Sequence, residues 1–145
     1  SPDIIAADAA ARQAIEFAAM KAVMDIEASL GFTPRDVSAE KCGYDVESLI
    51  PEAMRQAEQN LASLRFIEVK GRAKGAGTVT VTKNEILTAL NKPDEFILAI
   101  VEVDGNQTNT LYLKTPFRNE LDFAAIGANF DIAELVNNSK VEYEG

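Results

Sequence analysis

The sequence contains no histidine and only one cysteine, Cys42. Without histidine, Ser-His-Asp and Cys-His nucleophilic sites are excluded, and so are zinc sites that depend on imidazole ligands. A single cysteine cannot form an internal disulfide, which favours a reducing, cytoplasmic location, and we expect it to be a small buried side chain. Any chemistry must therefore come from carboxylates, lysines, hydroxyls or a hard metal ion.

Long apolar runs are also absent. No stretch of about 18 apolar residues occurs, so the sequence predicts no contact with the interior of a membrane. With 145 residues, of which 47% are hydrophobic and 26% charged, the chain fits one globular domain. It does not begin with methionine, and we therefore expect residues 1–145 to be one domain of a larger protein.

The chain is short of positive charge, with a net charge of −9. This argues against a free-standing nucleic-acid-binding protein, because phosphate contacts require cations. The charge is uneven, however, since residues 65–83 carry a local charge of +4 from five basic residues and one acid, Glu68. Among the basic residues, Arg72, Lys74 and Lys83 indicate either contacts with phosphate groups or a solvated basic face.

The residue patterns predict alternating helices and strands. Helical spacing predicts helices at about 9–30, 51–64, 82–91 and 131–139, with residues 51–64 alternatively forming a polar hairpin tip. Strand patterns occur at 43–50, 64–71, 78–81, 95–103 and 110–115, and a short strand is expected within 32–39. The run 95–103 is apolar almost throughout, as in a central strand covered on both faces. This order predicts an α/β or α+β fold with a mixed central β-sheet flanked by helices.

The segment RFIEVKGR, residues 65–72, places a carboxylate and an ammonium group on one face of a strand. Glu68 and Lys70 are two positions apart, so their side chains lie about 7 Å from each other. Asp45 lies on the strand predicted at 43–50, and it meets Glu68 across the sheet if the two strands are neighbours. The alternatives are an exposed ion pair between Glu68 and Lys70 and a turn cap at Asp45.

Two converging carboxylates repel each other unless a proton or a cation lies between them. Mg²⁺ or Mn²⁺ suits such a pair, because Mg²⁺ binds one or two carboxylates and keeps other positions for water and substrate phosphates. A lysine beside the ion can position or activate water. Asp45, Glu68 and Lys70 therefore indicate metal-assisted hydrolysis of phosphodiesters.

Other polar residues extend this hypothesis. Glu27 falls on or beside the buried face of the first helix, where a carboxylate is costly unless a metal ion or a lysine pairs with it. It is therefore a further metal ligand, an ordinary partner of a lysine or a solvated edge residue. Asn84 and Glu85, at the start of the helix after TVTV, are expected to extend the polar shell.

At KCGYDVES, RFIEVKGR and TVTVTKNEILTAL the chain resembles the NO VEIN C-terminal domain family, whose fold is similar to that of PD-(D/E)XK restriction-endonuclease-like nucleases. The resemblance runs from the first helix to FILAIVEV. It implies that Asp45 is the motif aspartate, that Glu68 and Lys70 form the E-x-K motif, and that Glu27 is the first-helix acid. Two features depart from the nuclease pattern: Tyr44 replaces the signature proline, and a longer connection replaces the short hairpin before the E-x-K strand.

The resemblance also implies a function. Such domains are found behind helicases in prokaryotic DNA-processing or defence proteins, and the expected activity is Mg²⁺- or Mn²⁺-dependent cleavage of nucleic acid, with DNA as the expected substrate. Two alternatives stay open: a non-cleaving nucleic-acid-binding or regulatory domain, and a protein–protein docking domain, because one fold serves several functions.

Overall fold

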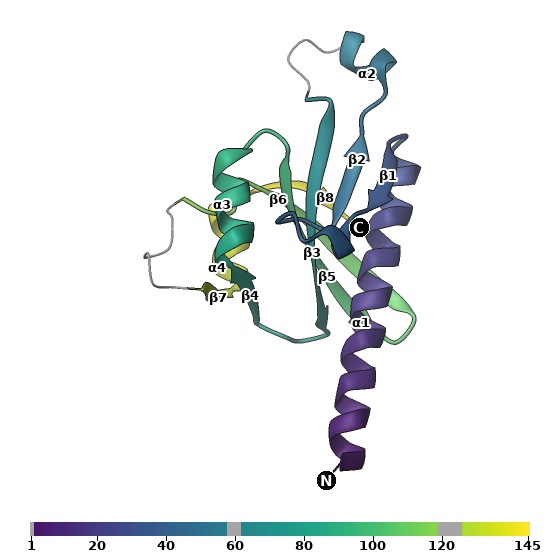
Figure 1. The fold of residues 1–145 in the computed structure, drawn as a ribbon, viewed down its shortest axis with the longest axis vertical. Coiled ribbons are helices and arrows are strands. Elements are labelled where there is room, and N and C mark those ends of the chain that lie inside the picture. Colours follow the sequence, from purple (N-terminus) through teal and green to yellow (C-terminus); the bar gives the residue numbers. More distant parts are fainter. Residues whose placement is uncertain (1, 58–61, 119–125) are drawn as a thin grey trace.

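The computed structural model describes residues 2–57, 62–118 and 126–145, with side chains described from residue 8 onward. The elements in chain order are α1 (Pro2–Ser29), β1 (Thr33–Asp36), the 3₁₀ helix η1 (Ser38–Glu40), β2 (Val46–Leu49), α2 (Glu52–Ala57), β3 (Leu64–Ala73), β4 (Thr78–Thr82), α3 (Lys83–Asn91), β5 (Phe96–Asp104), β6 (Gln107–Lys114), β7 (Gly127–Asp131), α4 (Ile132–Asn138) and β8 (Lys140–Glu144) (Figure 1).

A six-stranded sheet with the order β1-β2-β3-β5-β6-β8 forms the centre of the fold. Strands β3 and β5 are parallel, and the other neighbours in this sheet are antiparallel. The chain passes from β3 to β5 through β4 and α3, and β4 pairs with β7 in a separate two-stranded sheet. The predicted mixed central sheet with flanking helices is confirmed.

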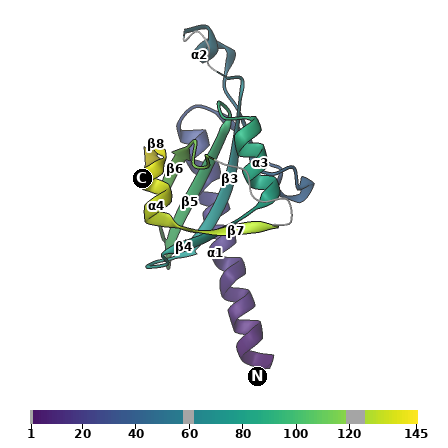
Figure 2. The same cartoon turned by 90° about the vertical axis from the view of Figure 1, so that its left-hand side faces the viewer.

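Helices cover both faces of the sheet (Figure 2). On one face, Ala19 and Val23 of α1 pack against the β3 and β5 side chains Ile67 and Ala99. On the other face, α3, α4 and the β4–β7 pair enclose a second core around Leu98 and the remaining apolar side chains of that face. Because β5 is covered on both sides, its residues 96–101 are all buried. The prediction of a central strand from the apolar run is therefore confirmed.

The first helix is longer than its sequence pattern predicts. It begins at Pro2 and has 28 residues, and its N-terminal part extends beyond the sheet (Figure 1). Contacts with the sheet come from Ile15 onward, and Ala19, Val23 and Glu27 are fully buried. Despite this length, none of the helices in the described residues is apolar enough over a sufficient length to cross a membrane.

Three other elements differ from the sequence pattern. The helix predicted at 51–64 is shorter, since α2 is Glu52–Ala57, and residues 58–61 lie outside the described residues. Strands β7 (Gly127–Asp131) and β8 (Lys140–Glu144) were not predicted. Both have partners far away in the sequence, because β7 pairs with β4 and β8 pairs with β6.

Gly71 allows α1 to approach β3 closely. A Cβ atom at this position would lie 2.9 Å from the Cβ of Ala19 and 3.0 Å from the carbonyl oxygen of Ile15, which is closer than real Cβ atoms normally come to other atoms. The glycine that follows Lys70 in the sequence therefore serves the packing of the helix on the strand.

We predict that Gly71→Ala lowers the free energy of unfolding by about 1–3 kcal/mol, because the added methyl group overpacks the contact with α1. Urea denaturation measures this change. Gly77→Ala is the matched control, since a Cβ there meets no atom within 4 Å and Gly77 has no positive φ. Equal stability of the two variants would show that α1 does not press on β3 at Gly71.

Candidate active site

Asp45 lies where the ladder between β2 and β3 ends. The last paired residues are Val46 and Ile67, and the Asp45 N–H donates to the carbonyl oxygen of Ile67 at 2.9 Å. The next β3 amide on this edge, that of Val69, donates to Oδ2 of Asp45 at 2.9 Å. The strand adjacency expected from the sequence is thus present, and this backbone bond holds the Asp45 carboxylate opposite Glu68.

Glu68 is buried, with 4% of its surface exposed, and its carboxyl group shares a hydrogen bond with that of Asp45. Burial raises the pKa of Glu68 to about 10, and the hydrogen bond and charge of Asp45 and the charge of Glu85 act in the same direction, whereas Lys70 opposes them. Glu68 is therefore protonated at neutral pH in this structure. Besides burial, the closeness of Asp45 favours the protonated form of Glu68, because two adjacent carboxylates repel each other.

Lys70 lies on the same face of β3, as predicted. Its Nζ is 3.6 Å from Oε1 of Glu68 and 2.9 Å from Oε1 of Glu85. Burial works against the charged lysine, but the neighbouring acids Glu68, Glu85 and Asp45 outweigh it and raise the pKa of Lys70. The lysine therefore stays an ammonium group at neutral pH, able to donate hydrogen bonds and unable to accept a proton.

Glu85 connects Lys70 to the first turn of α3. Thr82 caps this helix, as expected: its side chain accepts from the Glu85 N–H, and Oε1 of Glu85 accepts from the Thr82 N–H at 2.9 Å in a capping box. The same Oε1 accepts from Lys70. Burial would raise the pKa of Glu85, but the bonds from Lys70 and Thr82 prevail and lower it. Glu85 therefore extends the polar cluster, as expected from the sequence, and is an ionised partner of the lysine.

Two hollows meet at the carboxyl pair. One, of about 450 Å³, runs along the open edge of β3 between α1 and β4 and includes Lys70 and Arg72. The other, of about 360 Å³, extends toward the start of α3 and includes Lys41. Both share Asp45, Glu68 and Ser38, a residue that no sequence signal singled out. The segment that carries Ser38 and Lys41 lies in front of β3, between α1 and α3 (Figure 1).

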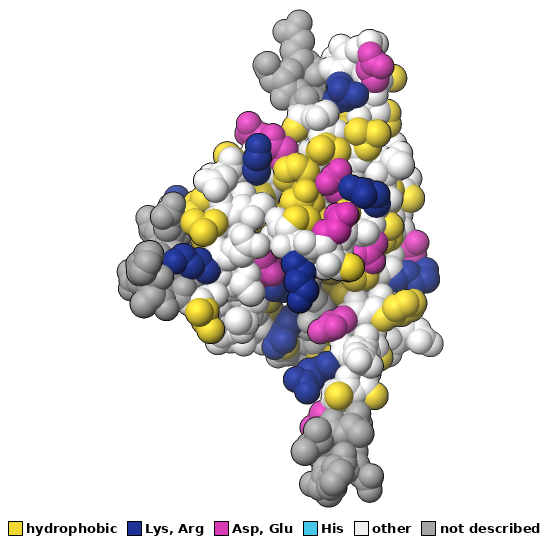
Figure 3. Space-filling model, in the orientation of Figure 1, with side chains coloured by type: hydrophobic (Ala, Val, Ile, Leu, Met, Phe, Trp, Pro, Cys, Tyr) yellow, Lys and Arg dark blue, Asp and Glu magenta, His cyan; other side chains and the backbone are white. Residues whose placement is uncertain are grey.

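Acidic and basic side chains are interspersed over the middle of this face of the molecule (Figure 3). Cys42, which was expected to be buried, is exposed in the same segment, so that prediction was wrong. Its hydrogen bond to the Tyr44 carbonyl oxygen, at 3.6 Å, is local. The carboxyl pair is therefore reached from solvent through hollows with a mixed polar lining.

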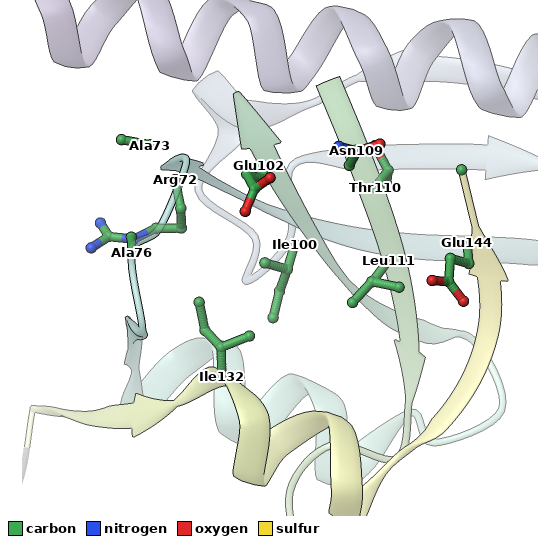
Figure 4. Close-up of a pocket in the computed structure, with 11 residues that line it drawn as sticks. Arg72, Ala73, Ala76, Ile100, Glu102, Asn109, Thr110, Leu111, Ile132 and Glu144 are labelled. Carbon is green, nitrogen blue, oxygen red and sulfur yellow. The ribbon is translucent and has the colours of Figure 1, made fainter. Parts of the chain in front are cut away.

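The three basic residues predicted to bind substrate, Arg72, Lys74 and Lys83, differ in whether they line the hollows at the carboxyl pair. Arg72 separates the β3 hollow from a further hollow of about 270 Å³, and Figure 4 shows its side chain directed toward Ala76 and away from Leu111. Its Nε atom is buried and has no hydrogen-bond partner within the described residues. Lys74 is exposed and lies 3.5 Å from Asp104, and Lys83 begins α3. Arg72 is therefore the one of the three that lines the site.

Glu27 is not brought to this cluster. It lies on the face of the sheet toward α1, where Oε1 accepts from Arg65 Nε at 2.8 Å and Oε2 accepts from Arg65 Nη2 at 3.2 Å and from the Tyr112 hydroxyl at 3.0 Å. Burial and the adjacent Glu27 carboxylate raise the pKa of Tyr112, so its hydroxyl remains a donor. Of the expectations for Glu27, the structure shows an ion-pair partner, with arginine in place of the expected lysine, and the solvated position was wrong because Glu27 is fully buried.

Within the described residues, no group of three or more Asp, Glu, Cys or His side chains is arranged to hold a metal ion. Mg²⁺ needs only one or two carboxylates, because water and substrate oxygens complete its shell. Asp45 and Glu68 fit that donor set, since they are hard oxygen donors and their carboxyl groups lie next to each other. These two residues are the ones that could hold Mg²⁺ or Mn²⁺.

The raised pKa of Glu68 predicts a specific dependence of stability on pH. Between the ordinary glutamate pKa of 4.5 and the folded value of about 10, the folded chain holds a proton that the unfolded chain releases, so stability falls as the pH rises. In metal-free buffer, Glu68→Gln removes this titration. The slope of unfolding free energy between pH 6 and 9 should become less negative, by up to about 1.4 kcal/mol per pH unit.

Urea denaturation at several pH values in the presence of a chelator measures these slopes. Glu144→Gln is the matched control, because Glu144 is an exposed glutamate on β8. If Glu68→Gln and the wild-type chain lose stability with pH at the same rate, Glu68 is not the protonated carboxyl group described above.

The ion pair on the α1 side predicts a different result for Glu27. Glu27→Gln leaves the Arg65 guanidinium, whose side chain is 11% exposed, without its buried counter-charge. Removing one partner of a buried pair costs about 3–5 kcal/mol, and urea denaturation should show a loss toward the lower end because glutamine keeps an acceptor. Calorimetric titration with Mn²⁺ should give the same affinity as the wild type. A loss of metal affinity without a loss of stability would contradict this assignment.

Comparison with known proteins was made for the whole chain. Residues 15–113 match the family described as Protein NO VEIN, C-terminal, and this range contains Asp45, Glu68, Lys70 and Glu85. No curated protein gives a significant match. No solved structure gives one either. Since the matched range covers well over half of the 145 residues, the chain belongs to the NO VEIN C-terminal family.

Proposed function

We propose that this domain is a metal-dependent nuclease module of the PD-(D/E)XK type that hydrolyses phosphodiesters in nucleic acid. The observation that carries the proposal is geometric: the Val69 N–H holds the Asp45 carboxylate opposite Glu68, at the end of the β2–β3 ladder, and the ammonium of Lys70 lies 3.6 Å from Glu68. Two hard carboxylates and one cation beside two hollows form the set of groups that metal-assisted phosphodiester hydrolysis requires.

Each residue has a distinct role in this mechanism. Asp45 and Glu68 would hold Mg²⁺ or Mn²⁺, which, when bound, supplies Lewis-acid polarisation of a phosphoryl oxygen. Lys70, held as a cation by Glu68 and Glu85, orients a water molecule by hydrogen bonding and stabilises negative charge that develops on phosphate oxygens.

Arg72 is proposed to contact a backbone phosphate. It lines the hollow that contains Glu68 and Lys70, and the buried N–H at its Nε lacks an acceptor within the described residues. A phosphate oxygen is a suitable acceptor for a guanidinium N–H. Lys74 and Lys83 lie further along the same basic segment and would contribute to attraction of the substrate more than to the reaction.

The wider context is proposed from the family resemblance. We propose that the domain belongs to a larger cytoplasmic protein with helicase domains, which deliver DNA to it. This arrangement would supply the affinity that a chain of net charge −9 has little means to provide by itself, because binding of nucleic acid depends strongly on the neutralisation of phosphates.

We predict that the chain cleaves a labelled DNA oligonucleotide in Mg²⁺ or Mn²⁺ and that chelation abolishes cleavage. Asp45→Asn and Lys70→Met should each lower the single-turnover rate by about 100-fold or more, because the first weakens the hold on the metal ion and the second removes a charge that acts on the reacting phosphate. Asp45→Asn keeps an acceptor for the Val69 N–H, so its fold should be retained. Gel electrophoresis of the products measures the rates, and circular dichroism checks the fold.

Lys140→Ala is the matched control for loss of a lysine, because Lys140 is exposed on β8 and lines none of the hollows described above. It should cleave as the wild type does. Binding of DNA without cleavage in either metal would favour the non-cleaving alternative. Cleavage that survives both Asp45→Asn and Lys70→Met would show that another site, or a contaminating enzyme, is responsible.

A further inference from the structure

The two hollows at the carboxyl pair continue into a third one on α1. This third hollow, of about 460 Å³, is lined by Phe17 and Met24 together with Glu16 and Met20. Glu16 and Met20 also line the β3 hollow that contains Glu68. The three hollows are therefore neighbours along one surface, and we call this row, from Phe17 past Asp45 and Glu68 to the start of α3, the trough. The candidate site lies within this trough and not at its end.

Phe17 lies at the α1 end of the trough with its ring in solvent. It is 75% exposed, and it is the one aromatic side chain in the described residues that is mostly exposed. It contributes nothing to either hydrophobic core of the fold. The partly buried side chains Met20 and Met24 lie beside it in the same hollow. A flat apolar ring beside a long polar trough offers a surface on which a planar group can stack.

The charges of the trough limit what can occupy it. The cations Lys41, Lys70 and Arg72 lie near the carboxyl pair. The Phe17 end carries the acids Glu16 and Asp36 and one cation, Lys21, whose charge is paired with Asp25 at 2.7 Å. A duplex presents two rows of phosphates and binds chiefly through cations, which the Phe17 end does not favour. A single strand has exposed bases, which stack on aromatic side chains whatever the base.

We propose that the substrate of this site is a single strand of nucleic acid, and that Phe17 is the platform on which a base stacks while the next phosphates reach the Asp45–Glu68 pair. This inference rests on the proposed function, because it places a nucleic-acid strand at that pair. The strand continues on both sides of the pair, which corresponds to cleavage within a strand and not to removal of terminal nucleotides.

The test is binding of a fluorescent 12-nucleotide oligothymidine, followed by anisotropy in chelator so that no cleavage occurs. Phe17→Ala should weaken binding by about tenfold, and Phe17→Trp should bind at least as well as the wild type. A labelled 12-base-pair duplex should bind more weakly than the single strand. Leu49→Ala is the matched control, because Leu49 is 46% exposed on β2 and lines no part of the trough, and it should leave binding unchanged.

Three outcomes would overturn the proposal. They are no measurable binding of the oligothymidine, equal binding by the wild type and Phe17→Ala, and duplex binding as tight as that of the single strand. A change in sedimentation on Phe17→Ala without a change in oligonucleotide binding would assign Phe17 to a protein interface instead. Because chelator prevents cleavage, this test is separate from that of the proposed function. The expected binding, with no cleavage in any metal, would refute the nuclease proposal alone. Cleavage of duplex DNA that Phe17→Ala does not affect would refute the single-strand proposal alone.

Discussion

The hydrogen bond from the Val69 amide to the Asp45 carboxylate determines the geometry on which the candidate site depends. Strand β3 continues after its neighbour β2 has ended, and a strand edge that loses its partner leaves amide groups without acceptors. The Asp45 side chain takes the place of the missing strand at Val69. This holds its carboxylate opposite Glu68, and the closeness of the two groups helps to keep Glu68 protonated. The side chain that ends the β2–β3 ladder is thus also the one that brings two carboxyl groups together.

Two buried ionic clusters lie on opposite faces of β3, and they differ in how well their charges are matched. On the α1 side, Arg65 and Tyr112 together satisfy both oxygens of Glu27, and the guanidinium also lies 4.6 Å from the ring centre of Phe32. On the α3 side, three carboxyl groups share the single ammonium of Lys70. A matched cluster stabilises a fold, whereas an excess of acid leaves room for a further cation. The difference separates a structural acid from the acids proposed to act on substrate.

The sequence predicts those parts of the site that depend on local pattern. The period of two along β3 places Glu68 and Lys70 on one face, and the Thr82–Glu85 spacing announces the start of α3. The partner of Glu27 is beyond such reasoning, because Arg65 lies 38 residues away and Tyr112 lies 85 residues away. Strand β7 was missed for a related reason. Its sequence, GANFD, has little intrinsic preference for a strand, and it forms one because it pairs with β4.

The double use of one glutamate oxygen limits which sequences this domain can adopt. Oε1 of Glu85 completes the helix cap at Thr82 and also holds Lys70. Aspartate is one carbon too short to reach both groups, glutamine caps the helix but carries no charge for the lysine, and alanine does neither. A residue that replaces Glu85 must therefore both cap the helix and pair with the lysine. We expect substitutions at position 85 to be coupled to substitutions at positions 70 and 82. One side chain thus determines both where α3 begins and how the charge of Lys70 is balanced.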